Sequence, residues 1–474
     1  MRTAIIGGGA AGLMATATLH AANPTAEIFL IDGNDGLGKK VIISGGGRCN
    51  VTTGIRDVRT VLMKYPRGAK FLSSAMHAFP PEAVMAWFES HGVPLKTEPD
   101  LRVFPKSDNG KDIVHVFERL FKTPDVHVLL KTRVVGIERR AGGGFLVRTN
   151  GSAAPLAVDT VVLTTGGQAY RQTGSTGDGY AFAMSLGHTL TPLAPGLNAF
   201  FTRETWPAEI SGVSFERATI TAHRAKKEPL TNSSSRAEQS GAERPPERSI
   251  GDFSTRSRDS LGRNDEIKNL QRYTFTGPFL FTHNGVSGPA VFALSSLVAF
   301  EPYDAAHPLD ITIDLFPDET TDALAARIRA SIAESPTKIL PNVLAMVIPK
   351  SLAAICVREN NLPATQHVSE IGKKDIQRAV AWLKAIPLHV IQRGAGDEFV
   401  TAGGIPLTEV DPSTMESRVC PGLYFAGEIL DIDGFTGGFN LQASWATGHL
   451  AGVSIAAHAC ITPPNPPSDL FAPG

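Results

Sequence analysis

The amino-acid sequence predicts an α/β fold in which a parallel sheet is interrupted by a large insertion. A continuous apolar strand at residues 3–6 runs into a glycine turn and an alanine-rich helix at 13–20, and a second apolar strand follows at 27–31. Such strands alternating with helices indicate a parallel sheet covered on both faces. The pattern stops after about residue 195 and returns near the C-terminus, with a strand at 422–426 and a helix at 441–457. The middle of the chain is therefore predicted to be inserted into one α/β domain.

The 474 residues suggest two to four domains, at roughly 100–200 residues each. Residues 226–272 are rich in Ser, Arg, Glu, Gly and Pro, so they cannot bury enough apolar surface to offset their ordering entropy. We predict a disordered loop there, with a docking or regulatory segment as the alternative. The expected divisions are residues 1–195 (first part of the α/β domain), 196–316 (β-rich insertion with that loop), 317–386 (helical subdomain), 387–400 (return strand of the insertion), 401–462 (second part of the α/β domain) and 463–474 (flexible tail).

Composition narrows the class of protein. Hydrophobic residues make up 42% and charged residues 19%, which is an ordinary globular balance. The net charge of −1 gives no sign of a nucleic-acid or membrane-surface partner. Four widely spaced cysteines form no C-x-x-C pair, so no metal site or disulfide framework is expected, and no apolar run approaches the roughly 20 residues of a membrane span. No secretory signal is visible either. A cytoplasmic protein is therefore expected, while its oligomeric state stays open.

A glycine turn follows the first strand. Gly7 permits a tight turn, Gly9 lets the backbone approach a pyrophosphate, and Gly12 lets the helix pack closely on the strand. The helix N-terminus supplies N–H groups and a positive dipole to the phosphates. Asp32 ends the second strand, where a ribose hydroxyl would be accepted. A glycine turn without a ligand is the alternative interpretation. The predicted contacts of this dinucleotide-binding unit are Gly7, Gly9, Ala10, Ala11, Gly12 and Asp32.

A second glycine loop follows the second strand. Three consecutive glycines before Arg48 make a flexible loop that can approach an anionic or heteroaromatic ligand. A lysine pair upstream could meet a phosphate, and Ser44 and Asn50 could hydrogen-bond a ring edge. Cys49 has no cysteine near it in the sequence, so a redox disulfide is not expected, and a solvent loop is the alternative for the whole segment. The predicted contacts are Lys39, Lys40, Ser44, Gly45, Gly46, Gly47, Arg48, Cys49 and Asn50.

A third glycine element follows the apolar strand at 158–164. A strand that ends in Gly-Gly at the carboxyl edge of an open α/β sheet lines the crevice where ligands bind. Thr165, Gly166 and Gly167 are therefore predicted cofactor contacts. Asp178 follows in a Thr-Gly-Asp-Gly run, where capping of the next helix is favoured over ligand contact.

A fourth glycine-rich element lies near the C-terminus. The strand at 422–426 runs into Gly427 and Glu428, a suitable position for ribitol hydroxyls. Close approach at Gly438 precedes a helix predicted to begin near Asn440, and its electropositive N-terminus would favour the reduced, anionic ring of a flavin. A domain that binds only NAD has no need of this element, so the sequence predicts FAD. The predicted contacts are Gly427, Glu428, Asp433, Gly438, Asn440, Leu441 and Gln442.

His283 is the candidate catalytic residue, because its charge changes near neutral pH and it stands in a Thr-His-Asn-Gly segment. A purely structural histidine is the alternative. The sequence has no G-x-S-x-G elbow, H-E-x-x-H motif, Walker signature or kinase signature, so hydrolytic and phosphoryl-transfer classes lose support.

Taken together, these motifs resemble the BaiN-like flavoprotein family, also described as aminoacetone-oxidase-type FAD-binding enzymes. The resemblance covers nearly the whole chain and includes Ile43–Asn50, Thr282–Pro289, Thr401–Gly404, Thr414–Ser417 and Gly422–Gln442. It implies a Rossmann-like FAD-binding domain with an inserted β-barrel domain and a helical subdomain. It also implies a backbone contact from Val134 to adenine. Some members reduce carbon–carbon double bonds of steroid-like substrates.

This chain departs from the family pattern at two places. It has Gly277-Pro278 where relatives tend to have Gly-Glu, which puts any role of that glutamate in doubt. The 226–272 segment is the second departure, and it lies just before the Thr-His-Asn-Gly segment, where it could alter access to the flavin.

The functional prediction is an FAD-dependent oxidoreductase. It would transfer a hydride between flavin N5 and a small or steroid-like organic substrate. NAD(P)H is a candidate electron donor that would bind transiently at the flavin face, because no second Gly-x-Gly-x-x-Gly turn follows a strand. The alternatives are a flavin-dependent tRNA-modifying enzyme, which the near-neutral charge disfavours, and a non-catalytic flavin-binding regulatory protein.

Overall fold

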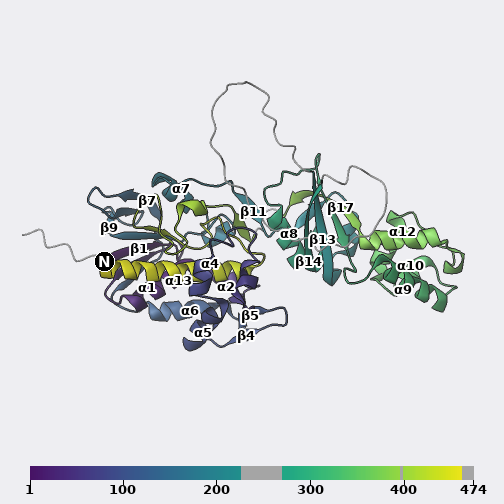
Figure 1. The fold of residues 1–474 in the computed structure, drawn as a ribbon, viewed down its shortest axis with the longest axis horizontal. Coiled ribbons are helices and arrows are strands. Elements are labelled where there is room, and N and C mark those ends of the chain that lie inside the picture. Colours follow the sequence, from purple (N-terminus) through teal and green to yellow (C-terminus); the bar gives the residue numbers. More distant parts are fainter. Residues whose placement is uncertain (226–269, 395–398, 462–474) are drawn as a thin grey trace, which may run out of the picture.

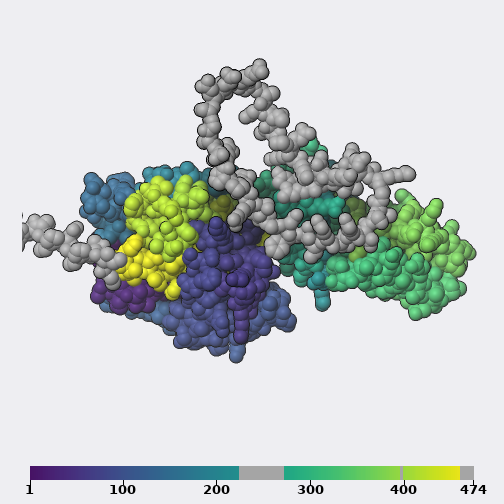
Figure 2. Space-filling view, viewed as in Figure 1, coloured from purple at the N-terminus to yellow at the C-terminus, as the bar shows by residue number. Residues whose placement is uncertain are grey.

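The structure is a computed structural model that describes residues 1–225, 270–394 and 399–461 (Figure 1). Most of the predicted loop, residues 226–269, and the predicted tail, residues 463–474, lie outside the described residues. Leu270 to Arg272, which the sequence analysis assigned to that loop, belong to strand β14 (Leu270–Thr282). Figure 2 shows two lobes: the purple N-terminal and yellow C-terminal segments share one, and the green middle segment forms the other.

The first lobe is built on a five-stranded parallel sheet with the order β19–β10–β1–β2–β6. Strand β19 comes from the far end of the chain, yet it pairs with β10, which in turn pairs with β1. The strands are apolar because the sheet is buried: residues 4–6, 161–163 and 423–425 are all below 5% exposed. This sheet confirms the predicted α/β fold class. Its strands are β1 (Arg2–Ile6), β2 (Glu27–Ile31), β6 (Val126–Leu129), β10 (Thr160–Leu163) and β19 (Leu423–Phe425).

Two helices pack lengthwise beside this sheet (Figure 1): α1 (Ala10–Ala22) and α13 (Gly437–Ile461). Glycines permit their close approach. A β-carbon at Gly448 would lie 2.3 Å from the carbonyl oxygen of Ala11, and one at Gly452 would lie 2.9 Å from that of Ala15. The N-terminal and C-terminal segments of the lobe therefore meet along a backbone-to-backbone contact.

Smaller elements complete the first lobe. A three-stranded antiparallel sheet has the order β3–β5–β4, and a second has the order β7–β8–β9. The bounds are α2 (Lys39–Ile43), β3 (Thr52–Thr53), α3 (Val58–Leu62), α4 (Ser73–Ala78), α5 (Pro81–Ser90), β4 (Leu95–Thr97), β5 (Arg102–Pro105), α6 (Gly110–Leu120), β7 (Val134–Arg139), β8 (Phe145–Thr149), β9 (Leu156–Val158), η1 (Arg171–Thr173) and α7 (Asp178–Ser185).

The second lobe contains a closed barrel with the order β12–β15–β14–β13–β16–β17. Its strands alternate: Ile220 and Ala222 are fully buried, whereas Thr219 and Thr221 face neighbouring threonines across the pair with β14. The barrel agrees with the fold that the family resemblance implies. Its strands are β12 (Phe200–Thr202), β13 (Ser214–Ala225), β14, β15 (Gly285–Ser287), β16 (Leu309–Asp314) and β17 (Ile386–Arg393), and α8 (Pro289–Leu297) and η2 (Trp206–Ile210) pack on it.

A helical unit extends from the barrel between β16 and β17 (Figure 1). Lys384 ends its last helix and joins it to the barrel, since its Nζ lies 2.6 Å from Asp314 Oδ2 and donates to two backbone carbonyls. The unit comprises α9 (Thr321–Glu334), α10 (Leu340–Leu344), α11 (Lys350–Glu359), η4 (Val368–Glu370) and α12 (Lys373–Lys384). Strands β11 (Ala194–Gly196) and β18 (Val400–Ala402) pair where the chain passes between the lobes, and η5 (Leu407–Glu409) follows β18.

Local predictions fail where a backbone angle or a tertiary contact decides. The apolar run at 126–137 does not form one continuous strand, because it breaks into β6 and β7 around Lys131, whose φ of 52° is left-handed. Asp178 does not cap α7: Gly177 is the N-cap residue, and Asp178 instead pairs with Arg133 at 2.9 Å. Helix α13 begins at Gly437, three residues before the predicted start.

We expect Gly448→Val to destabilise the first lobe. Its side chain would meet the Ala11 backbone, and overpacking of this kind costs about 1–3 kcal/mol. Thermal unfolding followed by circular dichroism should shift to lower temperature. Gly142→Val is the matched control, because no atom lies within 4 Å of the β-carbon that it would add. Equal melting temperatures for the two variants would contradict the importance of the α1–α13 contact.

Candidate functional site

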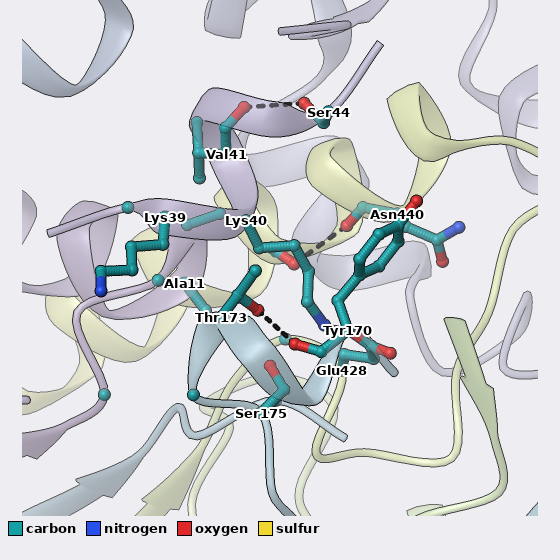
Figure 3. Close-up of a pocket in the computed structure, with 18 of the residues that line it drawn as sticks. Ala11, Lys39, Lys40, Val41, Ser44, Tyr170, Thr173, Ser175, Glu428 and Asn440 are labelled. Carbon is teal, nitrogen blue, oxygen red and sulfur yellow. Dashed lines mark hydrogen bonds and ion pairs between the residues drawn. The ribbon is translucent and has the colours of Figure 1, made fainter. Parts of the chain in front are cut away.

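A cavity of about 630 Å³ runs along the carboxyl edge of the parallel sheet and reaches the second lobe. The turn after β1, the loop after β2, α2, the ends of β10 and β19, and the start of α13 all contribute to its lining. Leu197, Pro289 and Phe292 line its far end from the side of the barrel. Figure 3 shows Lys39 on one side of this pocket, and Tyr170 and Asn440 on the other.

The start of α1 forms a cradle for an anion. Gly7 has a φ of 109°, and a β-carbon there would lie 2.6 Å from the Thr164 carbonyl oxygen. At Gly9, by contrast, no atom lies within 4 Å of such a position, so the backbone is open toward the cavity. No side chain caps the helix N-terminus, which leaves its first N–H groups for a ligand. A pyrophosphate fits this cradle.

Asp32 is fixed by the backbone beside that turn. Its Oδ2 accepts from the Gly8 N–H at 2.7 Å, and its Oδ1 accepts from the Asn34 N–H at 2.7 Å. Each carboxylate oxygen keeps a further lone pair for a hydroxyl donor. The carboxylate lines the cavity next to the glycine turn, so the structure allows the ribose contact that the sequence predicts.

An ion pair spans the middle of the cavity. Lys40 Nζ on α2 lies 3.0 Å from Glu428 Oε2 in the loop after β19, and both side chains line the pocket (Figure 3). Glu428 Oε1 also accepts from the Thr401 N–H at 2.9 Å. The lysine and glutamate are 25% and 15% exposed, so water screens their attraction only in part. The pair therefore joins the two sequence-distant halves of the lobe at the predicted cofactor site.

The glycine loop after α2 brings only some of its residues to the cavity. Gly45, Gly46 and Gly47 all have positive φ, and the first two line the pocket. With the Asn50 amide turned so that both of its polar atoms are satisfied, it accepts from the Gly438 N–H at 3.2 Å and donates to the Thr52 carbonyl at 3.1 Å. This bond ties the loop to the start of α13.

Other predicted contacts in this loop point elsewhere. Arg48 turns away from the pocket: its Nη1 lies 2.7 Å from Glu98 Oε1, and its guanidinium lies 3.8 Å from the centre of the Phe104 ring. Cys49 is fully buried, and burial raises the pKa of its thiol to about 12. These two side chains shape the loop without reaching the cavity.

Most predicted cofactor contacts do line the pocket. They are Gly7, Gly9, Ala10, Ala11, Asp32, Lys39, Lys40, Ser44, Gly45, Gly46, Asn50, Val134, Thr165, Gly166, Gly427, Glu428, Asn440 and Leu441. Eight predicted contacts are not among the residues that line the cavity, and their contact with a cofactor stays a prediction: Gly12, whose added β-carbon would lie 1.9 Å from the Gly7 carbonyl oxygen, Gly47, Arg48, Cys49, Gly167, Asp433, Gly438 and Gln442.

Two of these eight residues are held by other partners. Asp433 is buried in an ion pair with Arg67, and it also accepts from Ser296 Oγ at 2.6 Å. Burial raises the pKa of this carboxyl, while Arg67 opposes that shift. Gln442 is fully buried: it accepts from Thr52 Oγ1 and donates to the Phe79 carbonyl. The side chains of Asp433 and Gln442 therefore connect segments that are far apart in the sequence.

His283 lies on the exposed turn between β14 and β15 and is not among the residues that line the cavity. The structure therefore shows no contact between His283 and the site that would support its predicted catalytic role. In the described part of the chain, no group of His, Cys, Asp and Glu side chains could hold a metal ion. Nor does any described helix combine the length and apolarity that a membrane crossing requires.

Sequence analysis misses the apolar end of the cavity. Leu197, Phe292 and Phe399 come from the insertion and its connections, so only tertiary structure brings them to the site. The one signal for Tyr170 in the sequence is its place four residues after Gly166, a predicted cofactor contact. Its φ of 57° could not be read from its residue type.

We expect Cys49 to resist alkylation in the native protein. A thiol reacts as thiolate, and burial disfavours that charged form. Treatment with iodoacetamide at pH 8, followed by peptide mass spectrometry, should find Cys49 unmodified without denaturant and modified with it. Rapid labelling of the native protein would mean that the glycine loop opens.

Comparison with known proteins gives a consistent picture. The family model for the HI0933-like protein Rossmann domain matches residues 1–454. A 3-dehydro-bile acid delta(4,6)-reductase from Clostridium scindens is 28% identical over 456 residues, which cover 96% of this chain and 99% of that protein. Ribosomal RNA dihydrouridine synthases from Haemophilus influenzae and Escherichia coli are 25% and 26% identical and cover 95% and 94% of this chain, and 98% and 95% of their own lengths.

These findings confirm the predicted BaiN-like resemblance and the predicted class of enzyme, a flavoprotein oxidoreductase. With its glycine cradle at the edge of a parallel sheet and a family match over nearly its whole length, the chain belongs to the HI0933-like family.

Proposed function

We propose that this flavoprotein binds FAD along the cavity and reduces a carbon–carbon double bond that is conjugated to a carbonyl group. One observation carries the proposal: a single cavity joins a dinucleotide cradle at the sheet edge to an apolar end beside the barrel. The first part suits a cofactor, and the second suits an organic substrate that the cofactor must reach.

The cavity offers a partner for each part of FAD. The α1 N-terminus would hold the pyrophosphate, Asp32 a ribose, and the Val134 backbone the adenine. Glu428 would meet the ribitol hydroxyls from the loop after β19. Bound there, FAD would supply the hydride at flavin N5. Both glycine-rich elements face the same cavity, which favours FAD over a cofactor that needs only the first.

The start of α13 suits the flavin ring. This helix has 25 residues and begins at Gly437, which lines the cavity beside Asn440. Its N-terminal N–H groups carry partial positive charge, and they would stabilise negative charge on the pyrimidine end of a reduced flavin. We expect the ring between this helix start and the Ser44–Asn50 loop.

The relatives suggest the reaction class. A delta(4,6)-reductase of a 3-dehydro bile acid acts on double bonds conjugated to a 3-oxo group, and formation of dihydrouridine saturates a ring double bond conjugated to a carbonyl. Both reactions add two hydrogens across an activated double bond. A hydride from the flavin and a proton from the protein would perform either one. NAD(P)H stays the candidate donor that reduces the flavin between turnovers.

We favour a small or steroid-like substrate over RNA. The end of the cavity beside the barrel is apolar, which suits an alicyclic ring system. The net charge of −1 gives no basic footprint of the kind that attracts a phosphate backbone. Reduction of a uridine in ribosomal RNA is the second candidate, because two relatives carry that description.

We expect the purified protein to release FAD when it is denatured. We also expect the substitution Lys40→Met to weaken FAD binding. The substitution leaves Glu428 without its cation inside the cavity, and a loss of about 1.4 kcal/mol would weaken binding about tenfold. Titration of the apoprotein with FAD, followed by flavin fluorescence, measures this change. Lys111→Met, an exposed lysine on α6, is the control. Recovery of NAD alone from folded protein would contradict the proposal.

We expect a conjugated enone to reoxidise the reduced protein. The bound flavin is reduced anaerobically with dithionite and mixed with a 3-oxo-4-ene steroid, with a uridine-containing ribosomal RNA fragment, or with buffer. The flavin absorption near 450 nm should return with the enone, and the product should gain two hydrogens by mass spectrometry. Reoxidation by the RNA alone would favour the second candidate. Reoxidation by neither substrate would contradict the reaction class.

A further inference from the structure

We propose that Tyr170 donates the proton that completes the reduction, from a position beside an apolar wall of the cavity. The apolar wall consists of Leu197, Pro289, Phe292 and Phe399. The inference rests on the proposed function and adds to it a named proton donor and a binding surface for the substrate.

Within the apolar wall, Phe399 offers uncovered surface to a ligand, whereas Leu197 is only 2% exposed. The rings of Tyr170 and Phe399 lie 5.5 Å apart between centroids, and those of Phe399 and Phe292 lie 5.1 Å apart. Phe399 lines the cavity and is still 41% exposed. A flat alicyclic or aromatic ring would remove this apolar area from water, which favours binding. The wall therefore favours a ring substrate held next to Tyr170.

The backbone holds Tyr170 in an unusual conformation. Tyr170 and Leu197 have φ values of 57° and 56°, which residues other than glycine rarely adopt. Such a conformation is strained and persists where the surrounding structure enforces it, often at functional sites. The Tyr170 carbonyl accepts from Thr173 Oγ1 at 2.7 Å and from the Thr173 N–H at 2.8 Å. In Figure 3 the Tyr170 ring points across the pocket toward the start of α13, where Asn440 lies.

The other ionisable residues that line the cavity are the alternatives to Tyr170 as the proton donor. Lys40 pairs with Glu428 at 3.0 Å, and Lys39 pairs with Asp35 at 2.7 Å. Arg133 pairs with Asp178 at 2.9 Å, Arg102 pairs with Asp100 at 2.6 Å, and Asp32 accepts two backbone N–H bonds. Among the described residues that line the pocket, none is a histidine or a cysteine. Tyr170 lines the cavity and is the phenol of this set, and a phenol keeps its proton at neutral pH.

The proton completes the balance of the reaction. The π bond of the substrate breaks as its β-carbon accepts a hydride from the bound reduced flavin, which is thereby oxidised by two electrons. The α-carbon of the substrate then takes the proton from the Tyr170 hydroxyl, and water restores that proton to the phenolate. A hydroxyl at the edge of the apolar wall would deliver the proton to one face of the substrate.

The test compares Tyr170→Phe with wild-type protein, and uses Tyr273→Phe as the matched control. Tyr273 lies on β14 and does not line the cavity, so the same atom is removed elsewhere. FAD content and the dissociation constant of the saturated steroid product should stay within twofold in Tyr170→Phe. The rate of flavin reoxidation by the enone should fall about 10²–10⁴-fold, the usual range for loss of a general acid. In heavy water, wild-type protein should place deuterium on one face of the α-carbon, and the variant should lose that selectivity.

The outcomes separate this inference from the proposed function. If wild-type protein reduces the enone and Tyr170→Phe does so at the same rate with the same deuterium placement, Tyr170 is not the donor and the function stands. If the variant loses FAD or product binding together with its rate, Tyr170 is a packing residue, which also overturns the inference. If none of the conjugated substrates reoxidises the reduced flavin of the wild-type protein, the proposed function itself fails.

Discussion

The close contact between α1 and α13 is the constraint on which the rest of the site depends. Gly448 and Gly452 let the C-terminal helix rest on the backbone of the N-terminal helix. The start of α13 and the loop after β19 are thereby brought beside the glycine turn of α1. Each segment alone offers helix N–H groups or a carboxylate, and their meeting lines one cavity of about 630 Å³.

A second constraint holds the barrel against this domain. Asp433, in the loop before α13, pairs with Arg67, and Ser296 at the end of α8 donates to the same carboxylate. Arg67 also donates to the Ser296 backbone carbonyl at 3.0 Å. Because α8 carries Pro289 and Phe292, this buried network helps to set where the apolar wall stands. Removal of one buried partner would leave an uncompensated charge, which is costly.

Sequence reasoning finds residues of the cavity where local backbone chemistry places them there. The Gly7–Gly12 turn, Asp32 and the Gly427–Glu428 element are recognisable because tight turns and close approach require glycine at fixed positions. It does not foresee the protein partners of Arg48 and Gln442, because a polar side chain beside a glycine loop looks the same in sequence whether it meets a ligand or another side chain. It fails again for Phe292 and Phe399, since their place in the cavity depends on how the barrel docks.

The two lobes contribute different parts of the proposed site, and this bears on substrate specificity. The proposed FAD contacts come from the α/β domain, whereas much of the apolar wall comes from the insertion and its connections. Substitutions in the wall can therefore change the ring that is held without disturbing the pyrophosphate cradle or the Lys40–Glu428 pair. In this chain, the wall presents phenylalanine, leucine and proline to the cavity, and such side chains recognise a ring by its apolar surface and shape.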